Sequence, residues 1–154
     1  MPARFFDSSA LAKRYVQERG SSWLVQLFDA TVLESRYAAR ITEVEVAAAL
    51  ARKKRDGTLS AADAAKALLA MGNDFAHSLQ IVEVTPALVA HAVTLTGAHN
   101  LRAYDAVQLA AVLEVHKTHV ALGQSGVALI SADADLNAAA SAEGLTVDDP
   151  NAHP

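Results

Sequence analysis

Short apolar runs alternate with longer helical segments along the whole of this 154-residue chain. Each run is only a few residues long and does not show the alternation of a strand with one solvated face. Strands that are buried on both faces and separated by helices are typical of parallel sheets. We therefore expect an α/β fold: a single three-layer domain whose parallel, five-stranded sheet has helices on both faces. The expected strands cover residues 3–6, 37–41, 79–84, 127–130 and 145–147.

Helix start signals mark the segments between these runs. Ser8 or Ser9 can cap the first helix, and Thr42 with Glu45 matches the capping-box pattern. Pro86 suits the first position of a later helix. The expected helices cover residues 8–19, 23–28, 42–55, 60–77, 86–97, 104–119 and 133–143.

The composition excludes several classes of protein. With no cysteine, the chain cannot form a disulfide scaffold or a thiolate metal site. No run is long enough to span a bilayer, and the N-terminal segment is too polar for a secretory signal, so we expect a cytoplasmic protein without a membrane partner. The motifs GxGxxG, GxSxG and HExxH and the P-loop are absent from the sequence. The length predicts one domain over residues 1–148, with a frayed tail at 149–154.

Acidic residues gather where the expected strands end. The carboxyl ends of parallel strands share one edge of the sheet, and ligands bind there. Each acid alone also suits the first turn of a helix, but several carboxylates at one edge repel one another unless a cation lies between them. Oxygen ligands without cysteine favour Mg²⁺ or Mn²⁺. The acids are Asp7, Glu43, Glu45, Asp105, Asp133 and Asp135.

Basic and aromatic residues provide candidates for nucleic-acid contact. The net charge of −4 means that such binding must come from a local patch or from a bound metal. Arg102 and Tyr104 flank Asp105 and could either pack at the rim of the site or touch a substrate. The candidates for contacts to a nucleic-acid backbone are Lys13, Arg14, Arg52, Lys53, Lys54 and Arg55. The last four also suit a helix C-terminus.

An apolar face on the second expected helix has two interpretations. Trp23, Leu24, Leu27 and Phe28 recur at helical spacing. They could pack in the core, or they could meet a partner protein.

Four blocks of the sequence resemble the motif blocks of PIN-domain ribonucleases. The blocks are FFDSSALAKRY, ITEVEVAAALARK, LRAYDAVQLAAV and LISADADLNAAASAEGL. They cover nearly the whole chain in order, and the similarity is greatest to VapC-type toxins of type II toxin–antitoxin systems. The resemblance implies a PIN-like fold. Many relatives carry His where this chain has Gln108.

The resemblance also assigns roles to individual residues. It implies that Asp7, Glu45, Asp105 and Asp133 are the catalytic, metal-binding acids. The hydroxyls implied to line the site are Ser8 or Ser9 and Ser131. Glu43 and Asp135 do not match the motif positions, but either could lie in an outer shell.

The function implied is Mg²⁺- or Mn²⁺-dependent hydrolysis of RNA phosphodiester bonds by an endoribonuclease. Asp7, Asp105 and Asp133 would hold one or two ions that lower the pKa of a bound water, with Glu45 assisting. Such a toxin inhibits translation, forms a homodimer and is neutralised by a cognate antitoxin protein. These partners and the RNA substrate are expectations drawn from the resemblance.

Two other classes remain open at this stage. One is a PIN-like module that binds RNA or protein without cleaving it. The other is an aspartate-based phosphatase or receiver-like domain, which would require Asp-x-Asp after the first strand or a Lys after the last. The chain has Asp7-Ser8-Ser9 at the first of these positions and no Lys after the last strand.

Overall fold

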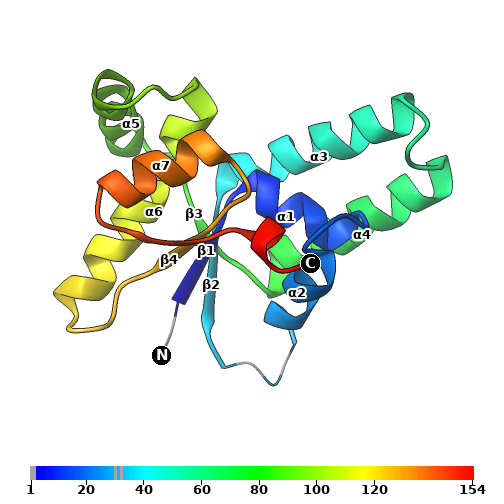
Figure 1. Ribbon diagram of the computed structural model, residues 1–154, viewed down its shortest axis with the longest axis horizontal. Coiled ribbons are helices and arrows are strands. Elements are labelled where there is room, and N and C mark those ends of the chain that lie inside the picture. Colours follow the sequence, from blue (N-terminus) through cyan, green and yellow to red (C-terminus); the bar gives the residue numbers. More distant parts are fainter. Residues whose placement is uncertain (1–2, 30, 32) are drawn as a thin grey trace.

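The computed structural model describes residues 3–29, 31 and 33–154, and these form one five-stranded sheet with seven α-helices (Figure 1). Every strand pairing is parallel, and the strand order is β3-β2-β1-β4-β5. The expected fold class is therefore confirmed. The strands are β1 (Ala3–Phe6), β2 (Ser35–Ala39), β3 (Gln80–Val82), β4 (Ala128–Ile130) and β5 (Thr146–Asp148). The helices are α1 (Ser8–Tyr15), α2 (Ser21–Leu27), α3 (Arg40–Arg55), α4 (Ala61–His77), α5 (Pro86–Ala98), α6 (Ala103–Ala121) and α7 (Ala134–Ala142), followed by the 3-10 helix η1 (Pro150–Ala152).

The sheet separates two hydrophobic cores. Successive side chains of a strand point to opposite faces, so Phe5 and Leu129 pack against α5, α6 and α7, whereas Phe6 and Ile130 pack against α1 to α4. All four side chains are fully buried. Figure 1 shows the two groups of helices on either side of the strands, with α3 and α4 extending away from the sheet as a long helical pair. Burial on both faces explains why the strands are short and apolar.

The chain changes direction across the sheet at β1. From β1 it proceeds to β2 and β3 on one side, and it then returns past β1 to β4 and β5 on the other. The topological switch point therefore lies between the carboxyl ends of β1 and β4, where an α/β sheet of this kind binds its ligands.

The boundary between β2 and α3 differs from the prediction. The strand was expected at 37–41, but Ser35 and Arg36 already pair with β1, and Arg40 and Ile41 form the first turn of α3. The predicted capping box at Thr42 is wrong. Thr42 is fully buried in the first turns of α3, and Gln108 of α6 contacts its hydroxyl.

The first helix also differs at both ends. It is capped by the side chain of Asp7 rather than by Ser8 or Ser9. It ends at Tyr15, four residues before the expected end, because Val16 turns to extended geometry and packs into the core.

The C-terminal segment is ordered in the structure, where the sequence predicts a frayed tail. Pro150 is buried, and the main chain of η1 lies against α2. The ring of His153 stacks on Trp23, with 4.0 Å between ring centroids. Leu24 and Leu27 on the same helix are buried in the core, so the apolar face of α2 serves packing within the chain.

None of the helices in the described residues combines the length and the apolarity needed to cross a membrane.

Candidate active site

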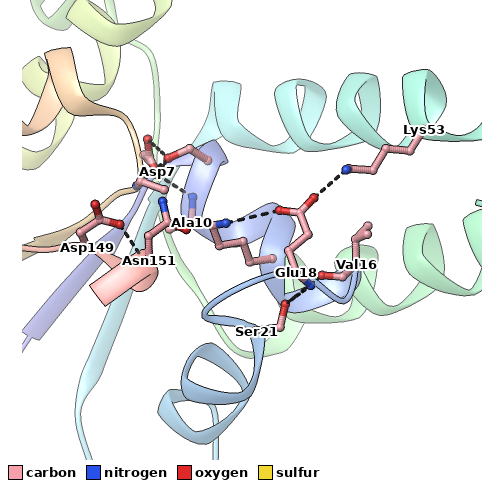
Figure 2. A network of polar contacts seen from close by, with 11 residues as sticks. Asp7, Ala10, Val16, Glu18, Ser21, Lys53, Asp149 and Asn151 are labelled. Atoms are coloured by element: carbon pink, nitrogen blue, oxygen red, sulfur yellow. Dashed lines mark hydrogen bonds and ion pairs between the residues drawn. The ribbon is translucent and has the colours of Figure 1, made fainter. Parts of the chain in front are cut away.

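The carboxylate of Asp7 is anchored at the switch point. Asp7 lies where β1 ends and is only 2% exposed. Its Oδ1 accepts a hydrogen bond of 2.9 Å from the backbone N–H of Ala10 (Figure 2). The hydroxyl of Ser9 lies 2.8 Å from both carboxylate oxygens, and the hydroxyl of Ser131 donates to Oδ2 at 2.9 Å. Residues from both sides of the switch point therefore hold this one acid.

Burial raises the pKa of Asp7 from its ordinary value of 3.8 to about 6, because desolvation disfavours a carboxylate. The hydrogen bonds from Ala10, Ser9 and Ser131 oppose this rise, and the negative charge of Asp133 adds to it. Even three donors do not offset the burial. A cation beside Asp7 would stabilise its charged form.

A cleft of about 470 Å³ opens at the same edge of the sheet. Glu45 from α3, Asp105 from α6 and Asp133, the N-cap of α7, line this cleft. Asp7 itself is buried behind Ser9, which lines the cleft and contacts Asp7. The other lining residues are Ser8, Ala12, Val44, Ala48, Ala49, Arg52, Arg102 and Tyr104.

The acids of the cleft disfavour one another's charge. Burial raises the pKa of Glu45, and the charge of Asp105 raises it further, against hydrogen bonds from Gln108 and Ser8. Burial likewise raises the pKa of Asp105, with a further contribution from Asp133. Arg102 opposes this shift only weakly, since its guanidinium is 4.0 Å from Asp105 and largely exposed. Within the described residues, the cleft thus concentrates carboxylates, and Arg102 offsets the charge of Asp105 only weakly.

The donors in and beside the cleft suit a hard divalent cation. They are carboxylate and hydroxyl oxygens, which Mg²⁺ and Mn²⁺ prefer. Within the described residues, no three His, Asp or Glu side chains are close enough to hold one ion. Asp7 and Asp133 are both engaged as helix caps. The residues therefore fit the cation by chemistry, and binding one ion through three of them requires their side chains to move closer together.

Two of the predicted acids lie away from the cleft. Glu43, two residues before Glu45, lines a different, mostly apolar groove and contacts Arg40. Asp135 is exposed beside His99, although its charge contributes to the raised pKa of Asp105.

The predicted basic residues separate into two groups. Lys13 and Lys53 both pair with Glu18, as Figure 2 shows for Lys53. Arg14 is also held within the molecule, because it makes two hydrogen bonds to the buried Asp74. The remaining residues are exposed on the last turns of α3: Arg52, which lines the cleft, Lys54 and Arg55.

Gln108, at the position where many relatives carry His, contacts the site although it is not among the predicted site residues. Its amide Nε2 lies 2.6 Å from Oε2 of Glu45 and 2.8 Å from the hydroxyl of Thr42. Its place one turn after Asp105 was the available signal, since residues three apart share a helix face.

Comparison with known proteins gives two kinds of similarity. No family model matches the chain. Two curated proteins from Mycobacterium tuberculosis strains, ribonuclease VapC45 and ribonuclease VapC49, are each 35% identical over 147 residues. Each alignment covers 96% of this chain and 95% of the relative.

Solved structures share the fold at lower identity. PAE2754 from Pyrobaculum aerophilum has a TM-score of 0.64 at 19% identity, covering 98% of this chain and 91% of that one. VapC20 of M. tuberculosis, described as a sarcin-ricin loop cleaving toxin, has a TM-score of 0.63 at 16% identity, with 97% and 98% covered. A toxin–antitoxin complex from Klebsiella pneumoniae has a TM-score of 0.60 at 18% identity, with 96% and 97% covered.

These structures define the class of the fold as the PIN-like α/β domain of VapC proteins. Since the curated relatives match over nearly their whole length, the chain belongs to the VapC ribonuclease family.

Proposed function

We propose that this chain is the toxin of a toxin–antitoxin pair and that its acidic cleft hydrolyses RNA phosphodiester bonds with Mg²⁺ or Mn²⁺. The observation that carries the proposal is the cluster formed by Asp7, Glu45, Asp105 and Asp133. These acids come from four segments of the chain: Glu45, Asp105 and Asp133 line one cleft, and Asp7 contacts Ser9, which lines the same cleft. Three of the four have raised pKa values. Such a cluster weakens the fold unless it binds a cation.

The acids and the hydroxyl residues at the cleft have different roles. Asp7, Asp105 and Asp133 would hold the cation, and Glu45 faces the same space. A divalent ion held there would neutralise charge on the phosphate and would lower the pKa of a water molecule, so that the water can lose a proton at neutral pH and become a nucleophile. Ser9 and Ser131 keep the carboxylate of Asp7 in place.

The rim of the cleft fits single-stranded RNA. Tyr104 is 59% exposed, and its ring offers a surface on which an unpaired base can stack. Arg52 and Arg102 lie on the same rim and can contact phosphates on either side of the scissile bond. Lys54 and Arg55 would extend the contact with the RNA backbone along the end of α3.

The partners follow from the same assignment. One solved structure of this fold is a toxin–antitoxin complex, which supports an antitoxin protein as a partner of this chain. We propose that the antitoxin blocks the cleft, that the toxin acts as a homodimer, and that cleavage of its RNA target stops translation in the cytoplasm.

The test is an RNA cleavage assay with protein freed of any copurifying peptide. Wild-type protein is incubated with total RNA in Mg²⁺, in Mn²⁺ and in EDTA. We expect discrete cuts with either metal and none in EDTA. Glu45→Gln and Asp105→Asn should abolish the cuts, whereas Glu43→Gln, on the same helix but outside the cleft, should leave them unchanged. A folded wild-type protein that neither binds Mn²⁺ nor cleaves RNA would instead be a non-catalytic binding module.

A further inference from the structure

Gln108 joins two helices beside the cleft through its contact with Glu45. It lies on α6 and is 1% exposed, and both of its contacts reach α3. Its Nε2 donates to Oε2 of Glu45 at 2.6 Å and to the hydroxyl oxygen of Thr42 at 2.8 Å. Because a carboxylate only accepts hydrogen bonds, the NH₂ end of the amide must face Glu45.

A residue that only filled space would not need the buried amide of Gln108, which disfavours the folded state. Among the described residues its carbonyl oxygen, Oε1, has no hydrogen-bond partner. Burying a polar atom without a partner disfavours the folded state, and an apolar side chain of similar volume would avoid that cost. The short hydrogen bond from Nε2 to Glu45 is the favourable interaction that compensates for this cost.

Glu45 needs such a contact to keep one orientation. Its side chain is long and only half-buried, so several rotamers are open to it. Besides Gln108, the Ser8 hydroxyl is the other side chain that favours its charged form. Gln108 is buried and does not line the cleft, whereas Glu45, Asp105 and Asp133 all line it. The amide therefore restrains one oxygen of Glu45 from the protein interior.

We propose that Gln108 is a positioning residue that fixes the carboxylate of Glu45 for binding a divalent cation. The inference rests on the proposed function, since it assumes that the cleft binds such a cation. Groups that orient a metal-binding carboxylate typically contribute about 10- to 100-fold to metal affinity.

The principal experiment measures the Kd for Mn²⁺ by calorimetry, on RNA-free protein. Gln108→Met keeps the length of the side chain and removes its donor. We expect the Kd for Mn²⁺ to rise about tenfold, and cleavage to recover partly at high Mn²⁺ concentration. Thr42→Val is the matched control, because it disrupts the other contact of the same amide and leaves the bond to Glu45. It should lower the melting temperature without changing the Kd.

A double-mutant cycle tests whether Gln108 acts through Glu45. In the Glu45→Gln background, adding Gln108→Met should leave the Kd for Mn²⁺ unchanged. If Gln108→Met does not fold, Gln108→Asn takes its place, since its amide is one methylene too short to reach Glu45.

The possible outcomes separate the two proposals. If wild-type protein binds Mn²⁺ and cleaves RNA while a folded Gln108 variant has the wild-type Kd, the positioning role is wrong and the proposed function stands. An equal loss of affinity in the Glu45→Gln background also overturns the positioning role. If wild-type protein does not bind Mn²⁺, both proposals fail.

Discussion

The hydroxyl of Ser131, at the end of β4, donates a hydrogen bond of 2.9 Å to Oδ2 of Asp7, at the end of β1. The two residues are 124 positions apart in the chain, and their strands are neighbours only because the topology reverses between them. The same hydroxyl oxygen lies 3.1 Å from the backbone N–H of Asp133 and accepts its hydrogen bond. Ser131 therefore connects the buried Asp7 to Asp133, which caps α7, and so helps to set the distance between these two acids.

Asp7→Asn should abolish cleavage and stabilise the metal-free protein at alkaline pH. The pKa of Asp7 is about 6 in the folded protein and near 3.8 when unfolded, so the folded state binds more protons between these pH values. Its contribution to the free energy of unfolding consequently falls as pH rises from about 4 to about 6. Above pH 6 the free energy of unfolding is lower by about 3 kcal/mol because of this group. Asn does not ionise, so the variant does not carry this cost.

Urea unfolding in EDTA at pH 8 and at pH 4 measures this effect. The variant should be more stable than wild type at pH 8, and the advantage should shrink at pH 4. Asp135→Asn, which alters an exposed acid, should show no comparable difference. A variant less stable than wild type at pH 8 would contradict the assignment of the raised pKa to burial.

Added Mg²⁺ or Mn²⁺ should stabilise the protein more strongly at pH 8 than at pH 5.5. Protons compete with the cation for Asp7, Glu45 and Asp105, whose pKa values are all raised. A cation at 100 times its Kd contributes about 2.7 kcal/mol to the free energy of unfolding. This stabilisation is measured as the change in melting temperature on adding the metal at each of the two pH values. NaCl at matched ionic strength is the control. Equal shifts at both pH values would exclude these carboxylates as the ligands.

Much of the fold follows from the sequence because burial leaves a local signature. The run around Phe5 and Phe6 and the run ending at Ile130 are apolar because both faces of the sheet are covered. Helix starts are equally local: Pro86 is the first residue of α5, as predicted, and Ser60 caps the helix expected from residue 60 by accepting from the N–H of Asp63.

Other features depend on contacts between distant segments. Thr42 matches a capping box by its spacing, but its hydroxyl is used by Gln108, 66 residues away. Arg14 carries the charge expected of an RNA contact, yet its partner Asp74 lies 60 residues along the chain. No local pattern encodes such pairings.

The acidic cluster could be predicted because topology places strand ends together. Asp7 and Asp133 share one edge because both follow parallel strands. The sequence pattern does not reveal that Asp7 is buried behind Ser9, or that Glu43 and Glu45 face different grooves. Those distinctions depend on the rotation of α1 and α3 against the sheet.

Gly20→Ala should destabilise the protein by displacing the C-terminal segment. Gly20 has a φ of +85°, and a Cβ there would lie 2.3 Å from the carbonyl oxygen of Pro150. Gly123→Ala is a matched control, since its φ is +75° but, its chain neighbours apart, no atom of the described residues lies within 4 Å of the added Cβ. We expect about 1–2 kcal/mol of destabilisation at Gly123 from the backbone alone.

At Gly20 the clash should add about 1–3 kcal/mol to that cost. Urea unfolding of both variants provides the comparison, and loss of the stacking of His153 on Trp23 should shift the fluorescence of Trp23, the only tryptophan in the sequence. Equal destabilisation by the two substitutions would mean that η1 does not pack on α2 in solution.

Tyr104→Ala should weaken RNA binding without affecting the fold. The ring is exposed at the rim of the cleft, so removing it creates no cavity. Stacking of a base on an aromatic ring contributes about 1–3 kcal/mol, which predicts a rise in KM of about tenfold with kcat largely unchanged. Tyr104→Phe retains the ring and should behave like wild type, and Leu122→Ala, at an exposed site outside the cleft, should have no effect. If Tyr104→Phe and Tyr104→Ala lose binding equally, the hydroxyl rather than the ring contacts the RNA, and stacking at this rim is excluded.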